Sequence, residues 1–541
     1  MVVPELRPWR AARPHLVRAA NAVRPRLARA EEAVRPQVAR AVEAVKPRLA
    51  RAVDVTKPQL TRLATVRPRK TWQYTATAAG AGLALTAVVV TAAGPWDSTG
   101  QRTAERDRAV ALQGTGGADH GGALGGSGAP APAPSAGSVL AGLGTAAGAA
   151  RATPTTASLA GVLGPLLKNP ALGSRHTAVV TDLATGERLY GAGAGEALTP
   201  ASTTKIATAV AALSALGADH RFTTRTALEP DTRELVLVGG GDPTLTAHAD
   251  ADGWADLRDL AERTAKALKK RGLDDITLSY DTTLFTGSQV HPIGVNDNLA
   301  PVTALTADEG RTDDSTSGPV TRVADPAADA TKKFASFLRG HGVKTSAPGP
   351  SKATGRSENL AEVTSPPLST LVERMLTNSD NDIAEALARQ VAVATGTRAD
   401  FAGGGRAVAA ALTRLGLPLK GARFRDGSGL DRADRLTADL LTALLVKAGD
   451  PARPELRAVL TGLPVAGFTG TLAGRYTDGA AGVVRAKTGT LTGVNTLAGT
   501  VVDRDGRMLA FAFLTADTTD PAEAQAALDR AATALAGCGC G

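Results

Sequence analysis

The segment ALTPASTTKIATAVAALSALG, residues 197–217, decides the fold prediction. A proline ahead and a glycine behind bound an Ala-rich apolar run, so a helix is predicted over residues 202–216. Ser202 starts that helix, and Lys205, in the only S-x-x-K of the chain, lies one turn later on the same face. A desolvated lysine can take the proton of a serine hydroxyl, and the helix N-terminus favours a developing oxyanion. Taken alone, such a pair is more often a capping serine beside a solvated lysine.

Two further polar motifs follow along the chain. The tripeptide SDN at residues 379–381 stands directly before a helical run at 382–391, so its serine and amide can face a cleft or simply cap the helix. The tetrapeptide KTGT at residues 487–490 lies within a predicted strand, where a lysine and two hydroxyls can bind a carboxylate. Its glycine would let a peptide approach the strand edge closely. The alternative interpretation of the same residues is an ordinary strand with a solvated lysine. A similar tripeptide, SEN at 357–359, is rejected because no apolar-periodic helix follows it at once.

The two ends of the folded body predict a shared sheet. Strands are predicted over residues 176–183 and 187–191, and three more near the C-terminus over 483–491, 494–503 and 507–515. A final helix over 522–536 is expected to be capped by Asp520. Strands at both ends with helices between them indicate an α+β domain whose sheet gathers both termini. Because only 3% of the residues are aromatic, the core must consist mainly of Ala, Val and Leu.

The order S-x-x-K, S-D-N, K-T-G is the signature of penicillin-binding proteins and class A β-lactamases. The chain resembles this active-site serine superfamily, and within it the low-molecular-mass class C penicillin-binding proteins, the D-alanyl-D-alanine carboxypeptidase/endopeptidase family. The resemblance covers about residues 158–536. It implies a β-lactamase/transpeptidase-like domain, with an antiparallel sheet, flanking helices and a helical subdomain, interrupted by one inserted subdomain at 222–345. Besides the three motifs, four further segments carry the resemblance: GGGDPTL (239–245), APVTALTADEG (300–310), DGSGL (426–430) and LPVAGFTGTL (463–472).

The resemblance implies an acyl-enzyme mechanism on peptidoglycan stem peptides, with no metal and no organic cofactor. Ser202, deprotonated by Lys205, attacks the carbonyl between two terminal D-alanines. Ser379 passes a proton to the leaving D-alanine, and Asn381 holds the acyl chain. β-Lactams are expected to inhibit by entering the same path. The expected catalytic residues are Ser202, Lys205, Ser379, Asn381 and Lys487, and the expected substrate-binding residues are Thr488, Gly489 and Thr490.

Two other functions stay open for this fold. One is a β-lactamase, which the wide separation of the first two motifs argues against. The other is a non-catalytic cell-wall-binding scaffold, which would not need all three motifs intact. Endopeptidase activity is a further option beside carboxypeptidase activity, although room for a single inserted subdomain puts it in doubt. The chain has no H-E-x-x-H and no G-x-S-x-G motif, which disfavours a zinc peptidase and an α/β-hydrolase.

The first 154 residues predict a membrane-anchored organisation. Residues 1–70 have a strong excess of Lys and Arg and a proline every eleven residues, which is typical of a basic tail that binds anionic lipid or stays disordered. The uncharged run 75–94 is long enough to span a bilayer, and its basic flank puts the N-terminus in the cytoplasm. Residues 97–154 form a Gly/Ala/Pro-rich linker. We therefore expect a single-pass cell-membrane protein with no nucleic-acid partner, whose catalytic domain (155–221 and 346–537) lies outside the cytoplasm.

Three further positions have structural interpretations. Asp242 is expected to fix its glycine-rich turn by hydrogen bonding, and Ser428, between two glycines, is expected to be structural rather than nucleophilic. Cys538 and Cys540 have one residue between them, which is poor geometry for a disulfide. They are expected to belong to a disordered C-terminal end, with metal binding or pairing to another chain as the alternatives.

Overall fold

The computed structural model describes residues 156–538 apart from 252, 347–348 and 477–478. The predicted basic tail, membrane span and linker lie outside the described residues. Within the described part of the chain, no helix is both long and apolar enough to cross a membrane.

The central sheet of the catalytic domain is antiparallel throughout and joins the two ends of the described chain. Strand β1 pairs with β13 along its whole length, from Arg175 opposite Ala516 to Asp182 opposite Leu509. The five strands predicted from sequence are confirmed, with bounds shifted by a residue or two. In sheet order they are β11 (Val484–Leu491), β12 (Val494–Val502), β13 (Met508–Ala516), β1 (Arg175–Asp182) and β2 (Arg188–Ala192).

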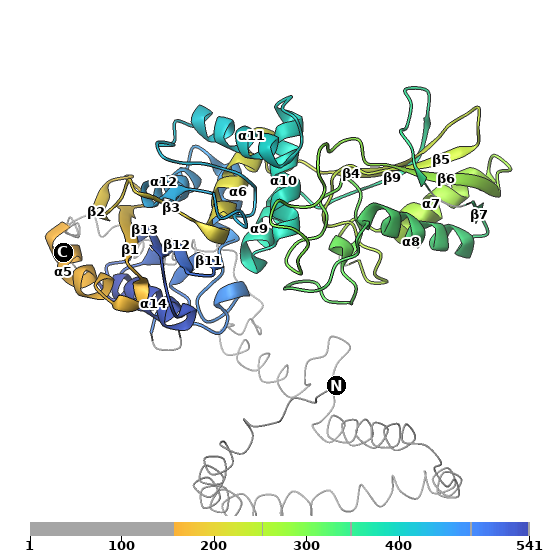
Figure 1. The fold of residues 1–541 in the computed structure, drawn as a ribbon. Helices are drawn as coiled ribbons and strands as arrows, with labels where there is room; N and C mark the ends of the chain where they lie inside the picture. The colour runs from red at the N-terminus through yellow and green to blue at the C-terminus, as the bar shows by residue number, and fades with distance from the viewer. Residues whose placement is uncertain (1–155, 252, 347–348, 477–478, 539–541) are drawn as a thin grey trace, which may run out of the picture. The chain divides into compact units, whose positions relative to one another are not determined.

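Helices cover both faces of this sheet (Figure 1). Helices α5 (Thr156–Leu167) and α14 (Pro521–Ala536) pack on one face around Phe511 and Phe513. The Asp520 side chain accepts hydrogen bonds from the N–H groups of Ala522 and Glu523, so the predicted N-cap of α14 is confirmed. Helix α12 (Ala438–Gly449) covers the other face and connects the sheet to the helical subdomain.

The helical subdomain is built by close packing of small side chains. A Cβ at Gly405 would collide with the Phe424 carbonyl, and one at Gly404 would crowd Ala388 of the neighbouring helix. Alanine and glycine at these contacts let the helix backbones approach, which is how a chain so poor in aromatic residues fills its core. Besides α12, its helices are α6 (Thr204–Leu216), α9 (Leu368–Asn378), α10 (Asn381–Ala394), α11 (Phe401–Arg414) and the short α13 (Ala458–Thr461).

The inserted subdomain is a mixed sheet with two helices on one face. Its apolar core lies between the sheet and helices α7 (Leu257–Lys269) and α8 (Pro326–Gly340). The sheet takes its last long strand from beyond the predicted limit at residue 345, because β9 pairs with β4 where the chain leaves and re-enters the catalytic domain. Its strands are β4 (Thr223–Leu228), β5 (Glu234–Val238), β6 (Asp275–Asp281), β7 (Lys344–Thr345), β8 (Gly349–Pro350) and β9 (Glu358–Thr364).

Several smaller features complete the described chain. The rejected tripeptide at 357–359 runs into β9, so no helix follows it. Asp242 Oδ1 accepts hydrogen bonds from the N–H and Oγ1 of Thr244, so its predicted role in the turn is confirmed. The remaining short elements are β3 (Ala197–Leu198), which pairs with β10 (Leu436–Thr437), and the 3₁₀ turns η2 (Pro170–Leu172), η3 (Ala201–Thr203), η4 (Asp308–Gly310), η5 (Pro454–Leu456) and η6 (Gly470–Leu472).

The C-terminal expectation is wrong for Cys538. This residue is buried against the α5/α14 side of the core and is disulfide-bonded, while the other cysteine of the chain lies outside the described residues. The reason is local: the helix end packs on the core, and the Cys538 carbonyl accepts a hydrogen bond from the Arg504 N–H.

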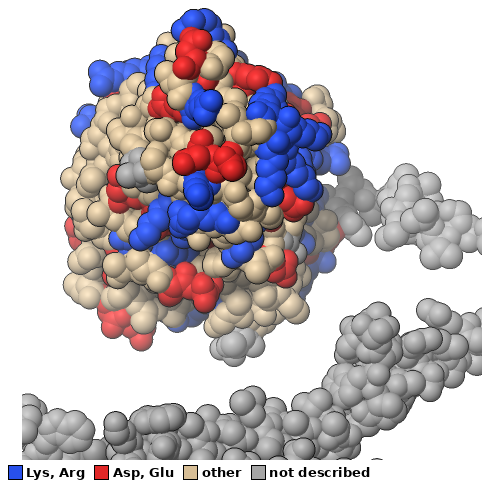
Figure 2. Space-filling view, turned by 90° about the vertical axis from the view of Figure 1, so that its right-hand side faces the viewer, with Lys and Arg blue, Asp and Glu red and all other residues tan. Residues whose placement is uncertain are grey.

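Charge on the face seen in Figure 2 is mixed. Basic side chains gather in places, but acidic side chains lie among them.

Candidate active site

The turn that carries Ser202 packs against strand β11. Ser202 lies in η3, immediately before α6, and Ala201 ahead of it has a left-handed backbone with φ 47°. Thr496 Oγ1 donates a 2.8 Å hydrogen bond to the Pro200 carbonyl. A Cβ at Gly489 would collide with that threonine and crowd Pro200. The backbone that approaches Gly489 is therefore the turn that carries Ser202, a neighbour that the sequence did not indicate. The predicted contact of Gly489 with substrate stays a prediction.

Lys205 is fully buried and its ammonium group has three partners. Nζ donates to Ser202 Oγ at 3.0 Å, to Asn381 Oδ1 at 2.6 Å and to the Ser428 carbonyl at 2.9 Å. Burial lowers the pKa of Lys205 to about 8, against the opposing charges of Asp426 and Glu385. A lysine with a pKa near 8 is neutral in an appreciable fraction of molecules near neutral pH, as a base for Ser202 must be.

The SDN motif joins two helices at the rim of the cleft. Ser379 ends α9 in a left-handed conformation with φ 59°, and Asp380 caps α10 by accepting a 3.0 Å bond from the Ile383 N–H. Asn381 is the first residue of α10, and its Nδ2 donates to the Asn298 carbonyl at 2.8 Å. Because Asn381 also accepts from Lys205, its amide orientation is fixed from both ends.

The KTGT motif lies on the edge strand β11, facing the serine. Lys487 is fully buried, and its Nζ donates to the Thr488 carbonyl at 2.8 Å. Burial, and then the nearby charge of Lys205, hold the pKa of Lys487 well below its usual range. Thr488 Oγ1 donates to Thr471 Oγ1 at 3.0 Å. An anion that enters beside Lys487 would favour the charged form of its amine.

The three motifs meet at one cleft of about 340 Å³. Ser202, Ser379, Asn381, Thr488 and Thr490 all line it, while Lys205 and Lys487 are buried behind its wall. Several other lining residues lie outside the three motifs, and the sequence predicted no role in the site for any of them. Three of these, Asn298, Arg311 and Arg322, belong to the inserted subdomain, and two, Leu430 and Thr471, belong to the catalytic domain.

A buried group of three carboxylates joins the inserted subdomain to the SDN motif. Asp382 pairs with Arg322 at 2.9 Å, and Glu309 pairs with Arg374 at 2.7 Å. Burial raises the pKa of Asp382 to about 7 although Arg322 opposes it, and burial with the charges of Asp380 and Asp382 raises the pKa of Glu309 well above its usual range. Asp380 keeps a lowered pKa despite burial, because Glu309 donates a hydrogen bond to it and Arg374 lies nearby. These contacts of Arg322 and Arg374 hold the rim that carries Ser379 and Asn381.

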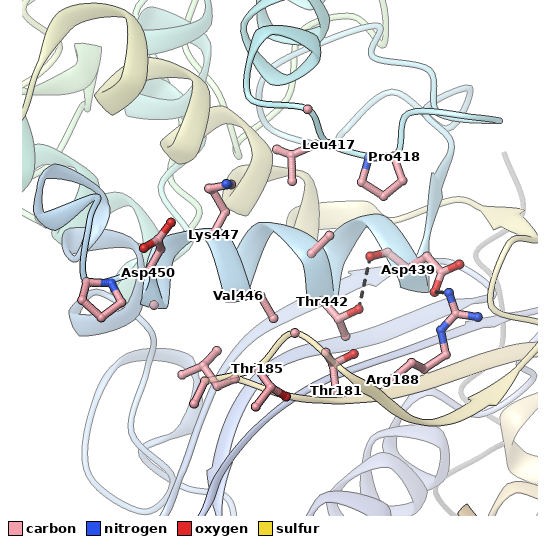
Figure 3. A pocket seen from close by; sticks show the side chains of 17 residues that line it. Thr181, Thr185, Arg188, Leu417, Pro418, Asp439, Thr442, Val446, Lys447 and Asp450 are labelled. Carbon is pink, nitrogen blue, oxygen red and sulfur yellow. Dashed lines mark hydrogen bonds and ion pairs between the residues drawn. The ribbon is translucent and has the colours of Figure 1, made fainter.

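A larger cavity of about 550 Å³ lies away from this chemistry, between α12 and the turn from β1 to β2 (Figure 3). Arg188 and Asp439 form a 2.7 Å ion pair at one end of it, and Lys447 and Asp450 lie at the other. None of the residues of the three motifs lines this cavity. The smaller cleft at Ser202 is the candidate active site because the reactive groups converge there.

A serine paired with a buried lysine, faced by a Ser-x-Asn turn and a Lys-Thr-Gly strand, defines the superfamily of active-site serine penicillin-binding proteins and β-lactamases. The chain matches the sequence model of the D-Ala-D-Ala carboxypeptidase 3 (S13) family over residues 159–318 and 313–535, and it belongs to that family.

Two relatives support this assignment, and one solved structure shares the fold. The chain is 38% identical to carboxypeptidase DacB of Mycolicibacterium smegmatis, over 72% of this chain and 86% of that protein. It is 32% identical to a D-alanyl-D-alanine carboxypeptidase of an Actinomadura species, over 66% of this chain and 80% of that protein. The crystal structure of penicillin-binding protein 4 from Haemophilus influenzae has the same fold, with a TM-score of 0.57, 23% identity, and coverage of 70% of this chain and 98% of that chain.

Proposed function

We propose that Ser202 and Lys205 carry out the serine-type D-alanyl-D-alanine carboxypeptidase reaction of this family on peptidoglycan stem peptides. The observation that carries the assignment is the 3.0 Å contact between the Lys205 amine and the Ser202 hydroxyl, inside a cleft that all three motifs share. Since the depressed pKa of Lys205 leaves part of the enzyme with a neutral amine, the reaction can start without a histidine or a metal.

In the proposed acylation step, Ser202 Oγ attacks the carbonyl carbon of the penultimate D-alanine while its proton passes to Lys205. The backbone N–H groups of Ser202 and Thr490 stabilise the oxyanion. The C–N bond to the last D-alanine then breaks, and Ser379 relays a proton to the leaving amine. Water hydrolyses the resulting ester, which returns the Ser202 hydroxyl and releases the shortened peptide. A β-lactam ring opened by the same attack has no separate leaving group to depart, so it remains as a slowly hydrolysed adduct.

Binding of the substrate is assigned to the two walls of the cleft. Thr488 and Thr490 line one wall, and with Lys487 behind them they are proposed to hold the terminal carboxylate. Asn381 lines the opposite wall and is proposed to orient the acyl chain, with Gly489 at the strand edge that the peptide follows. Endopeptidase activity on cross-linked peptides is a second proposal, supported by the presence of Asn298 and Arg311 of the inserted subdomain in the lining of the cleft.

The function is tested by mass spectrometry on two substrates. A purified peptide ending in D-Ala-D-Ala should lose one D-alanine, and penicillin should leave a stable adduct on the protein. Rapid turnover of penicillin with no peptide hydrolysis would instead establish a β-lactamase, and the absence of both adduct and hydrolysis would establish a non-catalytic scaffold.

Replacing Lys487 by alanine separates binding from chemistry. A charge-assisted hydrogen bond to a free carboxylate is worth roughly 1.5–3 kcal/mol, so Lys487→Ala should lower kcat/KM for the free peptide by about ten- to two-hundred-fold. A C-terminally amidated peptide lacks the charge, so it should react poorly with the natural enzyme and lose little more in the variant. An equal loss on both peptides would mean that Lys487 acts on Lys205 or Ser379 and not on the carboxylate.

The cellular location is proposed from the sequence ahead of the folded body. Residues 75–94 would anchor the chain in the cell membrane, residues 97–154 would hold the catalytic domain outside, and residues 1–70 would lie in the cytoplasm near anionic lipid. Protease added to intact spheroplasts should cut the linker and release an active, penicillin-binding fragment. Digestion of residues 1–70 with the catalytic domain left protected would show the opposite orientation.

A further inference from the structure

The catalytic lysine is held on one side by a loop that contains none of the three motifs. This loop, Asp426–Leu430, presents the Ser428 carbonyl to Lys205 Nζ at 2.9 Å. Thr208 Oγ1 donates to the Gly427 carbonyl at 2.6 Å. A Cβ at Gly427 would collide with α10, and one at Gly429 would collide with the carbonyl of Ala201, so the loop has no free space on either side. Any displacement of the loop therefore moves the carbonyl that orients Lys205.

Two buried carboxylates fix the loop through its backbone. Glu385 of α10 accepts hydrogen bonds from the N–H of Gly427 at 3.1 Å and of Ser428 at 2.8 Å. Asp426 accepts from the N–H of Gly429 at 2.7 Å and of Asp431 at 2.6 Å. Hydrogen bonds to charged acceptors in a water-free interior are strong, and a carboxylate that loses a donor there is costly.

An imidazole from the inserted subdomain adds a further donor beside Asp426. His291 Nε2 lies 3.0 Å from Asp426 Oδ2, with both side chains almost wholly buried. Its Nδ1 accepts a 3.2 Å hydrogen bond from the Ile293 N–H, so the proton of the neutral ring belongs on Nε2. The ring packs edge-on against Phe401, with centroids 4.9 Å apart, which holds it in this orientation. Although His291, Glu385 and Asp426 lie close enough to suggest a cation site, their facing atoms are already engaged by these donors.

We propose that His291 is a positioning residue for the catalytic base: its Nε2–H holds Asp426, Asp426 holds the Asp426–Leu430 loop, and the Ser428 carbonyl of that loop orients Lys205. The inference rests on the proposed role of Lys205. It gives the inserted subdomain a part in the acylation step itself, because His291 lies within that subdomain while Lys205 and Asp426 belong to the catalytic domain.

The arrangement also sets the electrostatic field at Lys205. Among the charges that raise the pKa of Lys205 against burial, Asp426 is the largest and Glu385 the next. Burial lowers the pKa of His291, but the hydrogen bond to Asp426 and the surrounding carboxylates raise it overall; in either protonation state Nε2 keeps its proton. A hydrogen-bond donor at His291 Nε2 offsets part of the negative charge of Asp426.

The other titratable or charged groups that face this cluster are Asp380, Asp382, Arg389, Asp431, Asp434 and Lys487.

The test compares three variants by their rate of acylation with a fluorescent penicillin from about pH 6 to about pH 10. His291→Gln keeps an N–H donor near the Nε2 position and should acylate within about threefold of the natural enzyme. His291→Phe fills the same space without a donor; it should acylate about tenfold more slowly, with the midpoint of its pH profile raised by roughly one unit. Asp426→Asn removes the negative charge and should move the midpoint in the opposite direction, to lower pH.

A purely structural role of His291 would not shift the midpoint of the pH profile in opposite directions in His291→Phe and Asp426→Asn. A matched control, His341→Gln, changes an exposed histidine of the same inserted subdomain and should leave rate and profile unchanged. Wild-type behaviour of His291→Phe, or an equal loss in the Gln and Phe variants with no shift in midpoint, would overturn the proposal. If His291→Phe fails to fold, the acylation rate of His291→Gln and the shift in pH midpoint of Asp426→Asn still test the proposal. Failure of the base role itself would appear separately, as normal acylation by a Lys205 variant.

Discussion

Replacement of Ser202 by alanine should abolish covalent labelling by fluorescent penicillin and release of D-alanine, because among the described residues that line this cleft no other hydroxyl has a hydrogen bond to a lysine. Of the three described partners of the Lys205 amine, the Ser202 hydroxyl alone can become an acyl ester, so the expected loss is complete within the detection limit of the assay. Thermal unfolding should be nearly unchanged, since Ser202 lies at the cleft surface and its side chain makes one contact with Lys205.

The matched control for this prediction lies on the same helix. Ser214→Ala, near the far end of α6, removes a hydroxyl that is remote from the cleft and should label like the natural enzyme. Labelling of Ser202→Ala, located by peptide mapping, would reveal a different nucleophile and end the proposed mechanism.

Replacement of Lys205 should slow acylation by about 10²–10⁴-fold, the usual contribution of a positioned general base. Two variants separate the base from its charge. Lys205→Met removes the amine and keeps most of the volume, while Lys205→Arg keeps a positive charge that does not dissociate near neutral pH. Both variants should show this loss if the neutral amine is what matters.

The pH dependence of the natural enzyme supports the same distinction. Burial lowers the pKa of Lys205 to about 8, so the neutral amine becomes the major form only above that pH. Acylation should therefore rise as the pH passes through about 8 and then level off, with the rise missing in both variants. Near-normal acylation by Lys205→Arg would show that the positive charge, rather than proton transfer, is the contribution of Lys205.

The sequence was sufficient to predict the secondary-structure elements that have a periodic pattern of apolar residues or a clear cap. The strands of the central sheet and helices α6, α10 and α14 were predicted to within a few residues, because alternation, apolar spacing and caps such as Asp520 are local signals. The motif residues were predicted to share a cleft, and Ser202, Ser379, Asn381, Thr488 and Thr490 do line one. Their roles in catalysis remain proposals.

The parts that escaped prediction depend on contacts between distant segments. His291, Asn298 and Arg322 reach the site from loops of the inserted subdomain, and a lone histidine or arginine in a loop carries no periodic signal. Ser428 was expected to be structural; the structure adds that its backbone carbonyl, which no sequence pattern marks, binds Lys205. The close approach of Pro200 to Gly489 likewise appears only after β11 and the serine turn are brought together.

The pairing of β1 with β13 has a consequence for how the enzyme matures. A chain made from its N-terminus presents Arg175–Asp182 long before Met508–Ala516 exists, so the central sheet stays open until synthesis is nearly finished. Contacts of such large sequence separation form slowly. The inserted subdomain, whose strands all lie between residues 223 and 364, is complete far earlier and can serve as the first folded unit. The turn that carries Ser202 meets Gly489 only after β11 has been made, so the nascent chain has no assembled catalytic centre until its last strands join.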